Sequence, residues 1–213
     1  MQSPTRISFV RHGHVHNPEN IYYGRLPNFR LSDEGEAQAR LAGLALRPYS
    51  IGAIYSSPML RAQQTAVIIQ EQLPNTPTIH TAEALIEVHT PHDGLSRPDL
   101  EARNWDLYTG SSSEYEQPAD VIKRIEGFIQ ECRVNHVGGH VVAVTHGDNI
   151  AFMALWALGQ IPDATRKASL LKPIIPDEYP QTASISTLTF QSTAVDELPK
   201  FEYYNPHAHQ LSE

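Results

Sequence analysis

The stretch ISFVRHG, residues 7–13, places an arginine, a histidine and a glycine directly after a short apolar run. That run has the length and composition of a buried β-strand. The stretch VVAVTHG, residues 141–147, repeats the pattern of apolar run, histidine and glycine. A third stretch, SSPMLRAQQTA at residues 56–66, follows another apolar run and puts Arg61 in the first turn of an expected helix. These repeated strand endings decide the fold class.

Segments typical of strands and of helices alternate along the rest of the chain. Ser32 followed by two acidic residues indicates a helix start. The segments 89–117 and 160–181 lack a clear period, and we expect them to be connections. Helices are expected from about Ser32 and over 59–73, 118–134 and 148–159, and strands over 51–56, 140–147, 184–190 and 200–205, with a short extended piece around 78–88.

This alternation predicts the architecture. Strands joined through helices form right-handed crossovers, which build a largely parallel sheet covered on both faces. We therefore predict a single α/β domain over residues 1–213, organised as a three-layer α/β/α sandwich around a mostly parallel sheet of about six strands.

Composition excludes several classes of function. The 213 residues carry a formal charge of −8, which disfavours nucleic-acid binding. No run approaches the ~18 to 20 apolar residues of a membrane span, and the N-terminal apolar run is too short for a signal peptide. We expect a cytoplasmic protein without nucleic-acid or membrane partners. The single cysteine, Cys132, lies on an apolar helical stripe, so we expect a buried structural thiol.

The three strand endings carry the chemistry. In a parallel sheet the carboxyl ends of the strands meet at one edge, where α/β folds bind ligands. Arg11, His12, Arg61 and His146 are therefore expected to lie together. A glycine after each histidine lets the backbone turn and approach a ligand closely. Arginine forks bind phosphate oxygens, and a neutral histidine among them can attack phosphorus, so the pattern predicts a phosphate pocket.

The same residues carry a resemblance to a known family. Arg11-His12-Gly13, Arg61 in its helix and His146-Gly147 together resemble the histidine phosphatase superfamily, the phosphoglycerate-mutase-like proteins. The resemblance extends over nearly the whole chain. Residues 17–39 are similar to the family's segment before its first helix, while 184–190 and the terminal NPHAHQL are similar to its closing strands and tail.

The resemblance implies roles for individual residues. His12 would be the nucleophile that becomes phosphorylated, and Arg11, Arg61 and His146 would complete the phosphate pocket. Glu87, in ALIEVH, best matches the family's proton donor. The other candidates for the donor are Glu83, His89 and Asp93, and residues expected to line the phosphate or substrate site are Asn17, Gly24 and Gly147.

Two departures from the family pattern bear on the reaction. His14-Val15 stands where Glu-Thr is commoner, and VHTPHDGLSRPDLEARNW replaces a Trp-Glu-Gly-like stretch after Glu87. Both departures favour a phosphatase, which hydrolyses a small phosphorylated metabolite, over a mutase-type phosphotransferase. The resemblance implies no cofactor and no metal. A homodimer is left open.

Two rival interpretations remain. A non-catalytic member of the same fold would bind a phosphorylated ligand without turning it over. The pattern His12-x-His14 also suits a metal-dependent hydrolase on an α/β barrel, since alternate residues of an extended segment point the same way. Such a barrel needs about 250 residues and eight strand-helix units, more than this chain offers. Arg11 and Gly13 also suit anion binding better than cation binding.

Overall fold

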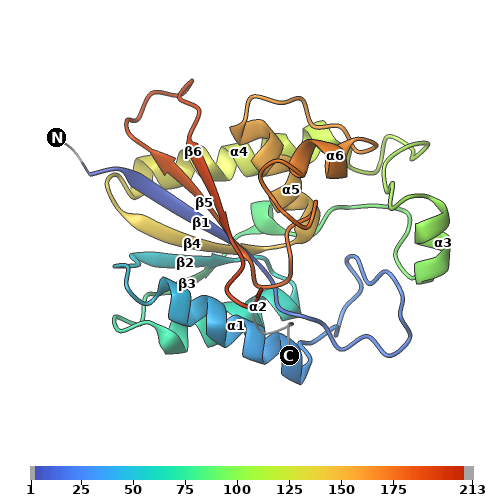
Figure 1. Cartoon of the computed structure of the whole chain (residues 1–213), viewed down its shortest axis with the longest axis horizontal. Helices are drawn as coiled ribbons and strands as arrows, with labels where there is room; N and C mark the ends of the chain where they lie inside the picture. The colour runs from blue at the N-terminus through green and yellow to red at the C-terminus, as the bar shows by residue number, and fades with distance from the viewer. Residues whose placement is uncertain (1–2, 209–213) are drawn as a thin grey trace.

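A six-stranded sheet forms the centre of the molecule in the computed structural model, which describes residues 3–208. The strand order is β3-β2-β4-β1-β5-β6. The predicted α/β sandwich with a mostly parallel sheet is confirmed (Figure 1). The strands are β1 (Thr5–Arg11), β2 (Ala53–Ser56), β3 (Ile79–Thr81), β4 (His140–Thr145), β5 (Ile185–Phe190) and β6 (Lys200–Tyr204).

Four neighbouring strands, β3, β2, β4 and β1, run parallel. Arg11 at the end of β1 pairs with Thr145 at the end of β4, and Ser56 at the end of β2 pairs with Val144. The three strand endings noted in the sequence therefore meet at one sheet edge. Strands β5 and β6 close the sheet as an antiparallel hairpin beside β1.

Helices cover both faces of the sheet, as Figure 1 shows. Alternate residues of β4 face opposite layers. Val142 and Val144 pack in the cluster with α1 (Asp33–Leu46) and α2 (Leu60–Gln72). Val141 and Ala143 pack in the larger cluster, which includes α4 (Pro118–Asn135) and α5 (Gly147–Ala157). Because nearly all of α5 lies within the core, its sequence is apolar on nearly every side.

Local sequence signals set most helix starts. The hydroxyl of Ser32 accepts a hydrogen bond from the Gly35 amide, so α1 begins as predicted. Pro118 occupies the first turn of α4, where its missing N–H costs nothing. Cys132 is buried on α4, as expected. Trp156 packs against the core but is only partly buried.

The expected connections contain short helices that the sequence pattern did not reveal. The stretch 89–117 includes α3 (Arg97–Ala102), and 160–181 includes α6 (Lys167–Leu171). The extended piece around 78–88 is β3 followed by the 3₁₀ turn η1 (Glu83–Leu85). Each helix is less than two turns long, too short for a period of 3.6 to stand out.

The described part of the chain has no helix that is both long and apolar enough to cross a bilayer. The terminal NPHAHQL, residues 205–211, lies partly outside the described residues.

Candidate active site

His12 follows the last residue of β1 and is buried at the sheet edge. Its Nδ1 lies 2.8 Å from the carbonyl oxygen of Gly13. A carbonyl only accepts, so Nδ1 carries the hydrogen and the lone pair remains on Nε2. The Gly13 amide donates to the Thr65 hydroxyl at 3.1 Å, which anchors this turn to α2. The local structure thus selects the tautomer in which Nε2 is unprotonated.

Glycine at position 13 is required by packing. A Cβ there would collide with the backbone of Gly35 at the start of α1, and a Cβ at Gly35 would collide with the backbone of His14. The turn after β1 and the start of α1 therefore approach each other backbone to backbone.

Three further predicted residues form one buried cluster beside His12. Nη2 of Arg61 lies 3.2 Å from Nδ1 of His146 and 3.4 Å from Oε2 of Glu87. The rings of His12 and His146 have centroids 5.2 Å apart. The structure therefore brings together the strand ends of β1 and β4, the first turn of α2 and the segment after η1.

Hydrogen bonds orient each member of this cluster. Nε2 of His146 lies 2.7 Å from the hydroxyl of Ser57, and Arg61 also donates to the carbonyl of Gly24 at 2.8 Å. The guanidinium of Arg61 lies 4.8 Å from the centre of the Tyr23 ring. The guanidinium of Arg61 is thus held by hydrogen bonds along its edge and by the Tyr23 ring against its face before any ligand binds.

Burial and the two arginines tune the ionisable groups. Burial, followed by the charges of Arg61 and Arg11, holds the pKa of His12 well below its usual value of 6.5. Burial and the Arg61 charge likewise lower the pKa of His146. Burial raises the pKa of Glu87 above its usual 4.5, although Arg61 and the Val88 amide oppose the rise. The cluster therefore favours neutral histidines beside a carboxyl group whose pKa is raised.

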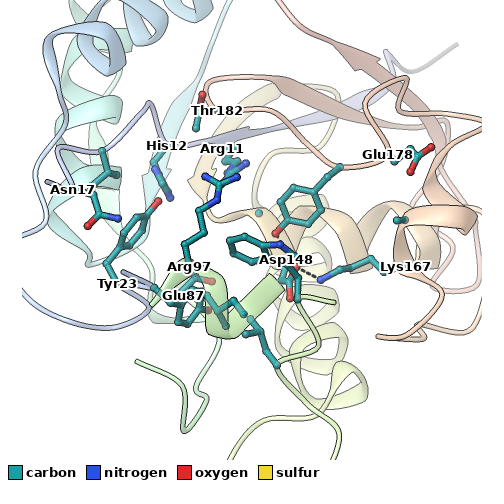
Figure 2. A pocket seen from close by; sticks show the side chains of 18 of the residues that line it. Arg11, His12, Asn17, Tyr23, Glu87, Arg97, Asp148, Lys167, Glu178 and Thr182 are labelled. Atoms are coloured by element: carbon teal, nitrogen blue, oxygen red, sulfur yellow. Dashed lines mark hydrogen bonds and ion pairs between the residues drawn. The ribbon is translucent and has the colours of Figure 1, made fainter. Parts of the chain in front are cut away.

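The cluster borders a cavity of about 670 Å³. Figure 2 shows Arg11, His12 and Glu87 among the side chains that line it. Of the other predicted residues, Asn17 and Gly147 line the cavity, whereas Arg61, His146 and Gly24 do not; Arg61 and His146 are fully buried behind its wall.

Arg11 is held from the far side of the cavity. Its Nη1 donates to the carbonyl of Pro180 at 2.8 Å, and its guanidinium lies 5.3 Å from the centre of the Tyr179 ring. The hydroxyl of Tyr179 donates to Asp148 in the first turn of α5. A Cβ on Gly147 would collide with Tyr179, so this glycine allows the ring to approach α5.

The remaining candidates have other surroundings. Glu83 is exposed on η1, and the backbone amide of His89 donates to Glu116 while its ring packs on Tyr115. Asp93 accepts from the Arg25 amide, and burial raises its pKa. None of these three candidate donors lines the cavity. Glu87 is the carboxyl group among the candidates that does.

Sequence reasoning missed several residues at the site. Ser57 orients His146, Thr65 anchors Gly13, and Tyr23 covers Arg61. Ser57 and Thr65 both lie within the SSPMLRAQQTA stretch, whose hydroxyls were the available signal. Asp148 and Lys167 pair in the cavity wall, and no local pattern links two residues 19 positions apart.

The geometry of this cluster can be compared with the alternative of a metal-dependent hydrolase. One ligand atom each from His12, Glu87 and His146 lies within 4.8 Å of the others, a spacing that a metal ion requires. However, the Arg61 guanidinium contacts both His146 and Glu87. A fixed cation among the ligands repels a second cation and attracts an anion. His14, the other half of the His-x-His pattern, is exposed and bonds to Ser32.

Comparison with known proteins identifies the family to which the chain belongs. The family model of the histidine phosphatase superfamily (branch 1) matches residues 7–193. An uncharacterised protein of Mycobacterium tuberculosis is 34% identical over 169 residues, which cover 75% of this chain and 82% of that protein. Phosphoserine phosphatase 1 of Hydrogenobacter thermophilus is 31% identical over 152 residues, covering 66% and 70%.

Solved structures share the fold. The mycobacterial glucosyl-3-phosphoglycerate phosphatase superposes with a TM-score of 0.76 at 23% identity, covering 95% of this chain and 99% of that one. YhfR of Bacillus stearothermophilus gives a TM-score of 0.72 at 23% identity, covering 94% and 95%. With the family match spanning most of its length, the chain belongs to the histidine phosphatase superfamily, branch 1.

Proposed function

We propose that the protein is a phosphomonoesterase that works through a phosphohistidine on His12. The observation that carries the proposal is the fixed tautomer of His12, whose Nδ1 bonds to the Gly13 carbonyl and whose Nε2 is left as the nucleophile beside the cavity. Glu87, with its raised pKa, lies next to it and can hold a proton for the leaving group.

The reaction takes two steps. Nε2 of His12 attacks phosphorus in line, the bond from phosphorus to the ester oxygen breaks, and Glu87 protonates the departing alcohol. Ionised Glu87 then takes a proton from water, whose oxygen attacks phosphorus. The P–N bond breaks, inorganic phosphate leaves and His12 regains its lone pair.

Positive charge around His12 supports the transfer. Arg11 lines the cavity and contacts the phosphoryl oxygens, while Arg61 and His146 act from directly behind the wall. The amides at the N-terminus of α5, beginning at Gly147, add partial positive charge on the same side. Fixed donors aimed at the charge that develops in the transition state are the largest source of rate enhancement.

Hydrolysis is favoured over the mutase reaction. Two of the proteins that this chain resembles are phosphatases, one for phosphoserine and one for glucosyl-3-phosphoglycerate. The departures of this chain at His14-Val15 and after Glu87 point the same way. Incubation with a phosphoglycerate separates the two activities, because a mutase yields the isomer and a phosphatase yields inorganic phosphate.

The direct test is capture of the intermediate. Wild-type protein quenched during turnover of phenyl phosphate should carry acid-labile, base-stable phosphate on His12. His12→Ala should carry none and should lose at least about 10³-fold in kcat, the usual cost of removing a nucleophile. His16→Ala is the matched control, because His16 is exposed on the same loop and lies outside the cavity lining. Wild-type turnover by His12→Ala would refute the proposal.

Metal independence is tested separately. Because Arg61 stands among the potential ligands, we expect dialysis against a chelator to leave kcat and KM for phenyl phosphate unchanged. Loss of activity on dialysis, with recovery on adding one divalent ion per chain, would favour the metal-dependent alternative.

A further inference from the structure

The cavity beside His12 is much larger than a phosphate group. Its volume of about 670 Å³ lies in the range of pockets that bind whole drug-sized ligands, about 300 to 1,000 Å³. Figure 2 shows His12 and Asn17 on one side of the pocket and Lys167 and Glu178 on the other. If the phosphate lies against His12, most of the volume is left for the alcohol part of the substrate.

We call the side of the cavity away from His12 the far wall. Lys167, at the start of α6, is a charged residue of this wall. Its ammonium donates to Oδ1 of Asp148, which also accepts from the hydroxyl of Tyr179 at 2.7 Å. The other carboxylate oxygen of Asp148 accepts from the hydroxyl of Tyr108 at 2.6 Å. The rings of Tyr179 and Phe152 lie 5.3 and 5.4 Å from the ammonium nitrogen. Lys167 is thus enclosed and neutralised by this network.

Arg97 on α3 is the remaining cation of the far wall. Its Nε donates to Oε1 of Glu101 at 2.8 Å, and its guanidinium lies 5.8 Å from the centre of the Trp105 ring. In the cavity lining that the structure describes, the lysines and arginines are Arg11, Arg97 and Lys167. The Arg97–Glu101 pair is exposed, so water screens it, whereas the pair of Lys167 with Asp148 is buried.

Acidic groups lie at the cavity rim on the same side as Lys167 (Figure 2). Asp177 and Glu178 line the cavity, and Asp177 is exposed there. Glu178 pairs with the exposed Lys172, a contact that water screens. A second negative charge on the substrate at this rim would face carboxylates, and the ammonium of Lys167 on the same side is already paired with Asp148. Such a charge would lose its hydration without compensation.

Apolar and aromatic side chains form the wall beside α3. Leu100 and Leu107 line the cavity and are otherwise buried, and Ala168 of α6 also lies in the lining. Trp105 also lines the cavity, with 43% of its surface exposed. Trp105 has φ of 56°, a left-handed conformation unusual for a bulky residue. An exposed aromatic ring held in an unfavourable backbone conformation at a cavity marks a contact surface.

We infer that the substrate is a phosphomonoester of a bulky, uncharged alcohol with a flat apolar face, which packs against Trp105 and Leu100 and carries no second phosphate or carboxylate. This inference rests on the proposed phosphatase function and narrows it to a substrate class. Its basis is the buried pairing of Lys167 with Asp148, the acidic rim and the apolar wall.

Three aryl phosphates test the inference. 1-Naphthyl phosphate and 4-carboxyphenyl phosphate have leaving groups of similar acidity, so the chemical step is matched while the size, apolar area and charge differ. Phenyl phosphate serves as the small neutral reference. We expect kcat/KM for the naphthyl ester to exceed that for the carboxyphenyl ester by at least about tenfold, with phenyl phosphate between them.

The outcomes separate the two levels of proposal. Hydrolysis of all three esters by wild type with a naphthyl to carboxyphenyl ratio near one, or below it, would overturn the substrate class alone, because His12-dependent turnover of phenyl phosphate would still support the phosphatase. If none of the three is hydrolysed, the proposed function fails and the substrate class fails with it.

Two variants locate the selectivity. Trp105→Ala should lower the naphthyl to carboxyphenyl ratio several-fold, because the ring that packs on the leaving group is lost. Asp177→Lys should raise kcat/KM for the carboxyphenyl ester, since the rim then attracts its charge. Tyr204→Ala, an exposed aromatic on β6 outside the cavity lining, is the control and should leave the ratio unchanged. An unchanged ratio in Trp105→Ala would overturn the role of this wall.

Discussion

At the scale of single residues, the reactivity of His12 depends on one main-chain carbonyl and two arginines. The carbonyl of Gly13 holds the hydrogen on Nδ1, and burial with the nearby arginine charges lowers the pKa of the ring. Both effects keep Nε2 unprotonated at neutral pH. Glu87 lies in the same dry cluster, where burial raises its pKa instead. One environment thus prepares a base and an acid, because burial disfavours the charged form of each.

The role of Glu87 predicts a pH effect. Because its pKa is raised above 4.5 and the proton must be present for donation, kcat/KM should fall as pH rises through that pKa. Glu87→Gln should remove this alkaline limb and lower kcat for phenyl phosphate by about 10²- to 10⁴-fold. The measurement is the pH profile of kcat/KM for both proteins.

Glu83→Gln is the matched control for this variant, because Glu83 is exposed on η1 four residues earlier. We expect its profile to match that of wild type. A large loss of activity in Glu83→Gln, with full activity in Glu87→Gln, would show that Glu83 and not Glu87 is the proton donor.

At the scale of elements, the site depends on backbone contact between the β1 end and α1. Ser32 starts α1, while Gly13 and Gly35 let the two backbones meet without side chains between them. The sequence indicated the strand, the cap and the helix through local patterns. It gave no sign that Gly35 is a contact point, since a glycine in a first helical turn is also tolerated without one.

Two glycine substitutions test this contact. Gly35→Ala should lower the free energy of unfolding by about 1–3 kcal/mol, because the new Cβ meets the backbone of His14 and the chain must shift. Gly127→Ala, in the middle of α4 with open space around the added carbon, should raise it by about 0.5–1 kcal/mol.

Urea denaturation of both variants and wild type provides the measurement. Equal effects of the two substitutions would show that the approach of α1 to the turn after β1 is not constrained. Because the same shift displaces the turn after His12, kcat for phenyl phosphate should fall in Gly35→Ala and not in Gly127→Ala.

At the scale of the whole molecule, buried histidines link stability to pH. Burial lowers the pKa of His140, on β4, to about 4, while its Nε2 bonds to the hydroxyl of Ser8. His12 and His146 have pKa values that are lowered too. Above the unfolded value of 6.5 these rings are neutral in both states. Below it, the unfolded chain binds protons that the folded chain excludes, so stability falls as pH falls.

His140 is the suitable residue for a test, because it lies away from the cavity lining. Between pH 4 and 6.5, His140→Gln should reduce the slope of unfolding free energy against pH by about 1.4 kcal/mol per pH unit, the effect of one proton. Denaturant titrations at several pH values measure it. An unaltered slope in His140→Gln would contradict the assignment.

The amino-acid sequence by itself determined the strand endings, the main helices, the order of the α/β layers and the residues that converge on the sheet edge. These follow from short-range signals, because burial in a strand or helix is written as a period within one segment. Parallel strands then bring Arg11 and His12 beside the strand carrying His146 without further information.

Only the tertiary structure decided the rest. It placed Arg61 and His146 behind the cavity wall, excluded Glu83 from it, and paired Lys167 with Asp148. These outcomes depend on side chains that meet from separate connections, whose conformations are fixed by packing against the finished core. No periodic pattern encodes such contacts, so the residues at the His12 end of the cavity could be predicted and those at the Lys167 end could not.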